Sequence, residues 1–579
     1  MKNRQFRTIN NLLIYKPMKK NILFIICYLF IITNNFAVHP DKNLLKTAKQ
    51  IENRIFSIYD HLIKTTICLP LGGSGILVSE DGYILTAGHI FLKAGLEIKV
   101  QLYDGKTYTA VTLGKDERRD YGLLKIKEKG SWQYTELGSS KDLKEYEACV
   151  MLGFPGEYQA GRHAVIRIGF VASKNTHGFL QTSCIMMPGD SGGPLFNMEG
   201  KLIGINSRIS RNINENCFAP VDKIKKNWEK LVKGDFFNKG ENSRNTFNSW
   251  GHYETSSEEQ TKGSQNPFVL AKGKDGLIEV LNAYGKKISK SVVDISSRLN
   301  GKSIDVYGCI VNSKGLIISK SSMVGNTEIN CRLHNGEKIS ASIVGRNKAN
   351  DLVLLQIKTK TRLYPIKFRK NVNIQLGQLL GSVNTKKVMY SGIVGVEAKR
   401  VKYIKFREHG HIGLKLYKGK TSIIKKVNQG EAAEKAGLQK DDKIIKIDTN
   451  SVRLKKDLIA YLKQTDAGEI IKVKIIRNNK EKEIEVQLGE SPSKKLLRKV
   501  SGNSHPAYNI DVNKRSDGFQ SAFKHDMLLY INECGSPVIN LKGEVIGINI
   551  ARTDRTASYA ISISKVAEVI QQIREEYGN

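Results

Sequence analysis

An internal repeat is the feature that most constrains how this chain folds. Three segments of the first half recur in the second half with the same spacing of apolar residues and turns. The matched pairs are residues 75–90 (GILVSEDGYILTAGHI) with 308–323 (GCIVNSKGLIISKSSM), 119–126 (RDYGLLKI) with 350–357 (NDLVLLQI), and 193–206 (GPLFNMEGKLIGIN) with 536–549 (SPVINLKGEVIGIN). A repeat of this kind means two copies of one supersecondary plan. The 579 residues therefore hold a duplicated domain together with other segments.

The local patterns within each copy are those of an all-β domain. Short β-rich runs alternate with Gly, Asp and Asn turns from residue 74 to about residue 220. An amphipathic helix leading into a strand is expected over 43–67, and a basic helix over 222–233. The chain is accordingly divided into a signal segment at 1–37, a first copy at 43–233, a linker at 234–275, a second copy at 276–408 and 490–579, and an inserted module at 409–489.

The first 37 residues predict export. They carry six Lys or Arg and no acidic residue, and residues 21–33 (NILFIICYLFIIT) form a short apolar run. A basic flank before a short apolar core is the pattern of a secretory signal. An uncleaved membrane anchor is the alternative. Either interpretation places the rest of the chain in the periplasm or cell envelope, or outside the cell.

The net charge of +36 raises the question of nucleic-acid binding. The sequence shows no recognition helix, zinc-finger spacing or aromatic RNA-binding stretch, and six of the charges lie in residues 1–37. We therefore expect no nucleic-acid partner. The remaining charge favours weak contact with an anionic surface of the envelope.

Eight cysteines lie far apart and lack CxxC spacing, so no metal site or cofactor is expected. One of them, Cys27, lies in the signal segment. Cys184 with Cys217 and Cys309 with Cys331 are candidate disulfide pairs. The sequence does not decide whether either forms.

Three motifs of the first copy predict nucleophilic catalysis. Ser191 lies in the Gly-rich stretch PGDSGGP, His89 closes TAGH, and Asp120 precedes an apolar strand. A serine hydroxyl needs a base, which His89 supplies, while Asp120 holds the imidazole and stabilises its charged form. The backbone N–H groups of Gly189 and Ser191 are the expected oxyanion donors. The order His–Asp–Ser is that of the trypsin-like proteases.

These stretches, together with LGFPG and FAPVDKIKK, resemble the trypsin-like protease domain of the HtrA/Deg family over residues 72–227. The resemblance implies a mainly β fold in which two β-barrels hold the triad in the cleft between them. It also implies cleavage of unfolded or misfolded proteins in the bacterial envelope and assembly into trimers or larger oligomers. Asp190 is a departure, because that family usually has Asn before the nucleophile.

The substrate pocket is predicted from the segments beside the nucleophile. Ile185, Met186, Ile205 and Ser207 offer apolar walls and no acidic side chain that could pair with a substrate Lys or Arg. We expect a preference for aliphatic side chains at the cleaved position. The alternative is that Ile185 and Met186 fill the core.

The second copy has lost the triad. The repeat places Ser322 opposite the catalytic histidine and Cys534 opposite the nucleophile, and only Asp351 keeps its identity. We therefore expect the second copy to be a degenerate, non-catalytic domain that serves packing, regulation or substrate binding. An active cysteine served by His525 or His505 is the alternative.

The inserted residues 409–489 resemble a PDZ domain of the HtrA type. His411, Ile412, Gly413 and Leu414 fit the loop that captures a C-terminal carboxylate, with the peptide adding as a strand. Peptide C-termini are thus expected partners. The whole chain is interpreted as an exported serine endopeptidase, and a peptide-binding scaffold or regulatory pseudoprotease is the alternative.

Overall fold

The computed structural model describes residues 40–577 with internal gaps. The gaps are residues 71, 156–162, 177, 210–215, 239–273, 300, 370–371, 397–409, 418–420, 449, 463–464, 466–469, 490–511, 517 and 520. The expected signal segment, most of the linker and His505 lie outside the described residues. No helix in the described ranges combines the length and apolarity needed to cross a membrane.

The first copy folds into two six-stranded units. In the first unit β5 pairs with both β4 and β6, and the short β13 (Phe236–Phe237) adds to β5 in parallel. Its strands are β1 (Thr66–Leu69), β2 (Gly73–Leu77), β3 (Tyr83–Thr86), β4 (Glu97–Gln101), β5 (Thr107–Asp116) and β6 (Tyr121–Ile126). The second unit is a closed barrel of β7 (Ala148–Gly153), β8 (Val165–Thr176), β9 (Phe179–Thr182), β10 (Pro194–Asn197), β11 (Leu202–Ile209) and β12 (Asn216–Pro220).

The second copy repeats this plan as two closed barrels. One contains β14 (Val292–Leu299), β15 (Lys302–Ile310), β16 (Leu316–Lys320), β17 (Thr327–Arg332), β18 (Lys338–Asn347) and β19 (Leu352–Ile357). The other contains β20 (Leu379–Val383), β21 (Val388–Val396), β28 (Ala522–His525), β29 (Pro537–Asn540), β30 (Val545–Asp554) and β31 (Ala557–Ser562). Closure leaves every strand paired on both sides, which removes the exposed edges that favour aggregation. The prediction of a mainly β, duplicated double-barrel fold is confirmed.

The inserted module has its own small core. It contains β22 (Leu414–Leu416), β23 (Ile424–Val427), α6 (Ala432–Lys435), β24 (Lys443–Ile447), β25 (Asn450–Ser451), α7 (Lys455–Leu462), β26 (Ile470–Arg477) and β27 (Lys480–Gln487). Alternate residues of β26 are buried, since one face of its sheet covers the core. Because this core is separate from those of the barrels, the module is a compact unit inserted between β21 and β28.

Helix α2 (Lys42–Thr65) joins the two copies. Its buried residues recur every three or four positions, and Asp41 caps its first turn by accepting from two backbone N–H groups. On the first copy, Arg54 Nε donates to the carbonyl of Met198 at 2.6 Å. On the second, a carboxylate oxygen of Glu52 accepts from the N–H of Leu379 at 2.8 Å. One apolar core therefore runs from this helix into both copies.

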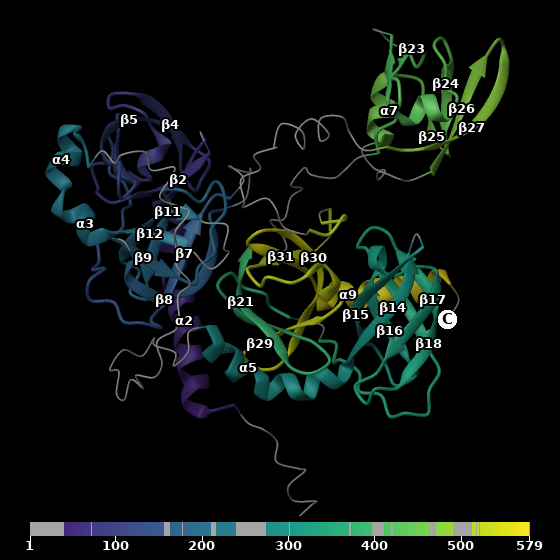
Figure 1. The fold of residues 1–579 in the computed structure, drawn as a ribbon, viewed down its shortest axis with the longest axis horizontal. Coiled ribbons are helices and arrows are strands. Elements are labelled where there is room, and N and C mark those ends of the chain that lie inside the picture. Colours follow the sequence, from purple (N-terminus) through teal and green to yellow (C-terminus); the bar gives the residue numbers. More distant parts are fainter. Residues whose placement is uncertain are drawn as a thin grey trace, which may run out of the picture.

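The two copies also meet directly, with β8 of the first beside β21 of the second (Figure 1). The N-terminal helix of the second copy, α5 (Lys274–Ile288), packs against β21 and α2. The chain ends in α9 (Ile563–Glu576), which contacts β18 and β30 and so connects the two barrels of the second copy.

One helix differs from the prediction. The expected helix at 222–233 is two helices, α3 (Val221–Lys226) and α4 (Trp228–Lys233), separated at Asn227. The side-chain amide of Asn227 donates to the hydroxyl of Tyr121 at 3.0 Å and to the carbonyl of Lys223 at 3.0 Å. Local bonds of this kind compete with the helical ladder, and periodicity does not reveal them.

Candidate active site

His89 and Asp120 are brought together at one end of the first barrel. Thr86 at the end of β3 pairs with Gly122 at the start of β6, so the segments after β3 and before β6 lie side by side. His89 Nδ1 is 2.9 Å from Oδ2 of Asp120, and the backbone N–H of His89 donates to Oδ1 at 2.8 Å. Asp120 has φ +57°, a left-handed conformation that few residues other than Gly, Asn and Asp tolerate.

This contact directs the histidine proton to the carboxylate. Burial lowers the pKa of His89. The hydrogen bond and the charge of Asp120 together raise this pKa by more than burial lowers it, so the net pKa lies above 6.5. The Asp120 side chain is 6% exposed and that of His89 is 51% exposed. Nδ1 thus faces the carboxylate, while Nε2 remains available to accept a proton.

Ser207 completes the support of Asp120. Its hydroxyl donates to Oδ2 of Asp120 at 2.7 Å from strand β11, across the boundary between the two barrels. The sequence placed Ser207 in the substrate pocket and did not predict this contact. Pairing of an individual hydroxyl with a carboxylate 87 positions away has no local signal in the sequence.

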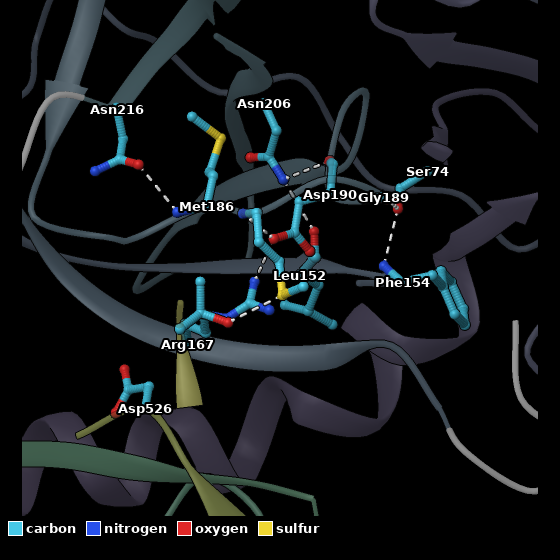
Figure 2. Close-up of polar contacts among 12 residues, drawn as sticks. Ser74, Leu152, Phe154, Arg167, Met186, Gly189, Asp190, Asn206, Asn216 and Asp526 are labelled. Carbon is cyan, nitrogen blue, oxygen red and sulfur yellow. Dashed lines mark hydrogen bonds and ion pairs between the residues drawn. The ribbon is translucent and has the colours of Figure 1, made fainter. Parts of the chain in front are cut away.

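Ser191 lies on a turn that two glycines make possible. Gly189 has φ +96° and Gly192 has φ +83°. A Cβ added to Gly192 would lie 2.1 Å from Oγ1 of Thr86 and 2.3 Å from the carbonyl oxygen of Ser74, so a larger residue does not fit. The turn is tied to the other barrel, because the N–H of Ser74 donates to the carbonyl of Ser191 at 2.8 Å. The hydroxyl of Ser74 donates to the carbonyl of Gly189, also at 2.8 Å (Figure 2).

The backbone around Ser191 has the form of an oxyanion site. The N–H of Asp190 donates to the carbonyl of Met187 at 3.0 Å, whereas no described residue accepts from the N–H groups of Gly189 or Ser191. Two such donors on one turn can stabilise a developing oxyanion. No hydrogen bond joins the side chains of Ser191 and His89 in the described structure, and such contacts commonly tighten only when substrate binds.

The three apolar residues of the predicted pocket are buried. Met186 and Ile205 are buried in apolar clusters, and Ile185 is 8% exposed. The N–H of Met186 donates to Oδ1 of Asn216 at 3.0 Å, which joins the segment before the nucleophile to β12 (Figure 2). The surroundings are apolar, and the preference for aliphatic side chains stays a prediction.

The second copy keeps the backbone of this site and changes its chemistry. Gly535 donates its N–H to the carbonyl of Asn549 at 2.7 Å, as Gly192 does to Asn206 in the first copy. Asp351 has φ +55°, close to the angle of its counterpart. The residues that these turns present are different, however.

In the second copy, the aspartate that matches the triad carboxylate forms an ion pair with a lysine. Asp351 accepts from the backbone N–H of Ser322 at 2.7 Å and from its hydroxyl at 2.8 Å. Nζ of Lys320, whose side chain is fully buried, lies 2.5 Å from Oδ2 of Asp351. Sequence reasoning missed Lys320, although a lone charge in the apolar strand LIISK was a usable signal.

Cys534 is held as a buried thiol. Its Sγ lies 3.4 Å from Oδ1 of Asn513, and burial raises its pKa to about 11 despite the nearby charge of Lys320. His525 shares a hydrogen bond with Asn549 at 2.9 Å, and its burial lowers its pKa to about 3, so it is neutral. Neither observation favours an activated cysteine.

The candidate disulfides are not formed. None of the seven cysteines of the described residues is in a disulfide, and all seven, including Cys184, Cys217, Cys309 and Cys331, are buried. These cysteines serve as small apolar side chains within the barrels. Their spacing along the sequence does not distinguish buried thiols from cysteines that form a disulfide.

The predicted PDZ loop is ordered by its own neighbours. His411 exchanges two backbone hydrogen bonds with Gly489, at 2.8 and 2.9 Å, and its Nε2 lies 2.8 Å from Glu431. The carbonyl of Ile412 accepts from the N–H of Ala433 at 2.7 Å. Gly413 has φ +82°, and a Cβ there would lie 2.4 Å from Glu431. Leu414 then begins β22, beside which a peptide strand would add.

Comparison with known proteins agrees with this geometry. Residues 73–205 match the trypsin-like peptidase domain family, and residues 404–488 match the PDZ domain family. A probable periplasmic serine endoprotease DegP-like of Hahella chejuensis is 42% identical over 144 residues, which cover 24% of this chain and 29% of the relative. Serine protease HTRA1 of Xenopus tropicalis is 38% identical over 167 residues, covering 27% and 35%. A DegP-like protein of Chlamydia pneumoniae is 34% identical over 165 residues, covering 27% and 33%.

These alignments cover about a third or less of the length of each relative. Within the matched regions, the predicted resemblance to a trypsin-like peptidase domain and to a PDZ domain of HtrA type is confirmed.

Proposed function

We propose that this chain, which combines an HtrA-type trypsin-like peptidase domain with a PDZ domain, is a serine endopeptidase that acts on unfolded or misfolded proteins. The observation that carries the proposal is the support of His89 by Asp120 at 2.9 Å beside a turn that presents Ser191. Its relatives are named as a serine endoprotease and a serine protease.

The reaction proceeds through an acyl-enzyme. Nε2 of His89 takes the proton of the Ser191 hydroxyl as Oγ attacks the scissile carbonyl carbon. The N–H groups of Gly189 and Ser191 stabilise the resulting oxyanion, and His89 then returns the proton to the leaving amine. A water molecule repeats the sequence to release the second product.

The remaining parts are given supporting roles. The PDZ domain binds peptide C-termini of substrates or regulators through the loop that contains Gly413, and the degenerate copy takes no chemical step. The apolar run in residues 21–33 and the relatives named as periplasmic favour an exported, envelope-associated protein. The resemblance favours a trimer or larger oligomer, and the positive charge favours weak contact with anionic envelope components.

A fluorophosphonate probe tests the central claim. It should label the wild-type protein at Ser191, while Ser191→Ala should stay unlabelled and should not degrade casein. Lack of labelling of a folded wild-type protein would refute the endopeptidase and favour the alternative, a peptide-binding scaffold or regulatory pseudoprotease. Binding of a peptide with an apolar C-terminus to the full chain, measured by titration with Gly413→Ala as the control, tests the PDZ role separately.

A further inference from the structure

A buried ion pair lies directly beneath the nucleophile turn. Nη1 of Arg167 on β8 donates to Oδ2 of Asp190 at 2.9 Å, and the two side chains are 1% and 0% exposed (Figure 2). Asp190 immediately precedes the nucleophile. The pair thus connects a barrel strand to the backbone that carries the reactive groups.

Asp190 organises the turn from within. Oδ2 also accepts the N–H of Met187 at 2.9 Å, and the carbonyl oxygen of Asp190 accepts from the side chain of Asn206 at 3.0 Å. The N–H groups of Gly189 and Ser191 flank this residue. A rotation of Asp190 therefore moves both expected oxyanion donors together.

Arg167 has unused hydrogen-bonding capacity. Its Nε and Nη2 and Oδ1 of Asp190 are buried and have no partner among the described residues. Because these atoms lack hydrogen-bond partners, hydrogen bonds alone do not fix the positions of the two side chains. The positions of Arg167 and Asp190 therefore depend on the residues packed around the pair. Those surroundings include the second copy.

A side chain of the second copy is hydrogen-bonded to β8, the strand that carries Arg167. Oδ2 of Asp526 accepts the N–H of Ile168, the residue after Arg167, at 3.2 Å. Its Oδ1 accepts the N–H of Ile393 on β21 at 2.7 Å. One buried carboxylate thereby fastens the arginine-bearing strand of the first copy to a strand of the second.

The turn between β30 and β31 of the second copy contacts the segment that precedes the nucleophile. The hydroxyl of Thr556 contacts Sδ of Met187 at 3.4 Å and donates to Asp554 at 2.9 Å. Although burial opposes it, pairing with Lys524 and the charge of Arg167 lower the pKa of Asp554 to about 2, so this carboxylate is charged. The charge of Arg167 therefore acts on one carboxylate from each copy, through an ion pair with Asp190 and through the lowered pKa of Asp554.

We propose that the degenerate second copy is a positioning element of the active site of the first: through Asp526, Asp554 and Thr556 it holds Arg167 and Met187, and so sets the Ser191 turn. The proposal rests on the proposed function, because it assigns these residues to the geometry of that nucleophile. It also supplies a reason for retaining a barrel pair whose own triad is lost.

The first experiment removes the contacts of the second copy. The double variant Asp526→Asn/Thr556→Val keeps side-chain volume and should lower kcat by about 2- to 30-fold, the range found for residues that modulate coupling between sites. KM should change much less. Amide hydrogen exchange across residues 185–193 should become faster, and this readout does not depend on catalysis.

A matched control lies in the other barrel of the second copy. Arg332→Gln breaks the ion pair with Asp294, whose atoms are 2.7 Å apart and partly exposed, and it should change neither kcat nor the exchange of residues 185–193. Equal kcat and equal exchange in the double variant and the wild type would overturn the proposal. Failure of the fluorophosphonate probe on the wild type would instead refute the proposed function, since the exchange measurement would still report on the turn.

The second experiment tests the charge beneath the turn. Arg167→Met leaves the carboxylate of Asp190 buried alone and should reduce kcat by about 100-fold through misplacement of the turn. Arg167→Met/Asp190→Asn removes the unpaired charge and should recover most of the loss. A double variant as impaired as the single one would contradict a positioning role for the ion pair.

The pH dependence separates this role from simple loss of structure. Burial raises the pKa of Asp190 and Arg167 lowers it, while Asp554 is the other charged group that acts on it. Without Arg167 the pKa rises further, so Asp190 is neutralised as the pH falls. The ratio of kcat in Arg167→Met to kcat in the wild type should therefore increase toward acid pH, and the Asp190→Asn double variant should lose this trend. A ratio that is flat with pH would count against the proposal.

Discussion

Replacement of Asp120 by Asn tests the triad most directly, because the structure specifies which atom changes. Oδ1 of Asp120 accepts the backbone N–H of His89 at 2.8 Å, so the asparagine keeps its oxygen there. Its NH₂ group then occupies the position of Oδ2, 2.9 Å from Nδ1 of His89 and 2.7 Å from Oγ of Ser207. Asparagine tolerates the left-handed backbone at this residue, so the fold should persist.

The consequence is a change of tautomer. An N–H directed at Nδ1 requires that Nδ1 become an acceptor, and the imidazole proton moves to Nε2. A protonated Nε2 cannot take the proton of Ser191. A substitution of this kind lowers kcat by about 10⁴-fold, which corresponds to about 5 kcal/mol in the barrier.

The assay combines labelling by a fluorophosphonate with turnover of casein, measured across the pH range in which histidine titrates. In the wild type, activity should be lost as the pH falls through a His89 pKa above 6.5, because the protonated imidazole cannot act as a base. In Asp120→Asn that acid limb should move to lower pH, since the carboxylate that raises the pKa is gone.

The control is the same substitution in the second copy. Asp351→Asn should lower thermal stability, because the buried Lys320 loses its partner at 2.5 Å, but it should leave kcat unchanged. If Asp120→Asn retained kcat within about tenfold of the wild type, the assignment of the triad would be wrong.

Four further predictions follow from single contacts. Gly192→Ala should lower kcat by at least about 100-fold in a casein assay, because its Cβ would overlap Thr86 and displace the nucleophile turn. Ser207→Ala should leave a buried oxygen of Asp120 without its 2.7 Å donor and reduce kcat by about tenfold to hundredfold, with little change in KM. Gly413→Ala should abolish binding of a C-terminal peptide while casein cleavage by the folded protein persists, since the new methyl group would meet Glu431. His525 has a folded pKa of about 3 against 6.5 in the unfolded chain, so unfolding takes up a proton below pH 6.5 and stability falls as the pH falls toward 3. Urea unfolding of His525→Gln should show a weaker loss of stability between neutral and acid pH, and an unchanged loss would contradict this assignment.

Comparison of the two copies shows why motifs predicted a triad but not the residues that support it. His89, Asp120 and Ser191 each lie in a stretch whose glycines, turns and strand ends follow one another along the chain, and the combination of the three stretches in this order predicted the triad. Arg167 and Lys320 have no such context. The only signal for either is a single charge within an apolar strand, in VIRIGF and LIISK, and nothing in the strand says what it pairs with.

The sequence by itself predicted the mainly β class, the duplication, the inserted PDZ domain and the candidate catalytic side chains, because strand patterns and turn glycines act over a few residues. The tertiary structure alone decided that Ser207 reaches Asp120 from the other barrel, that the cysteines remain thiols, and that Lys320 takes the carboxylate of the degenerate copy. It also decided that Asp526 joins the strand of Arg167 to the second copy across 358 positions of the chain. Contacts of this kind depend on how closed barrels pack against each other, and a buried polar atom finds its partner in space rather than along the sequence.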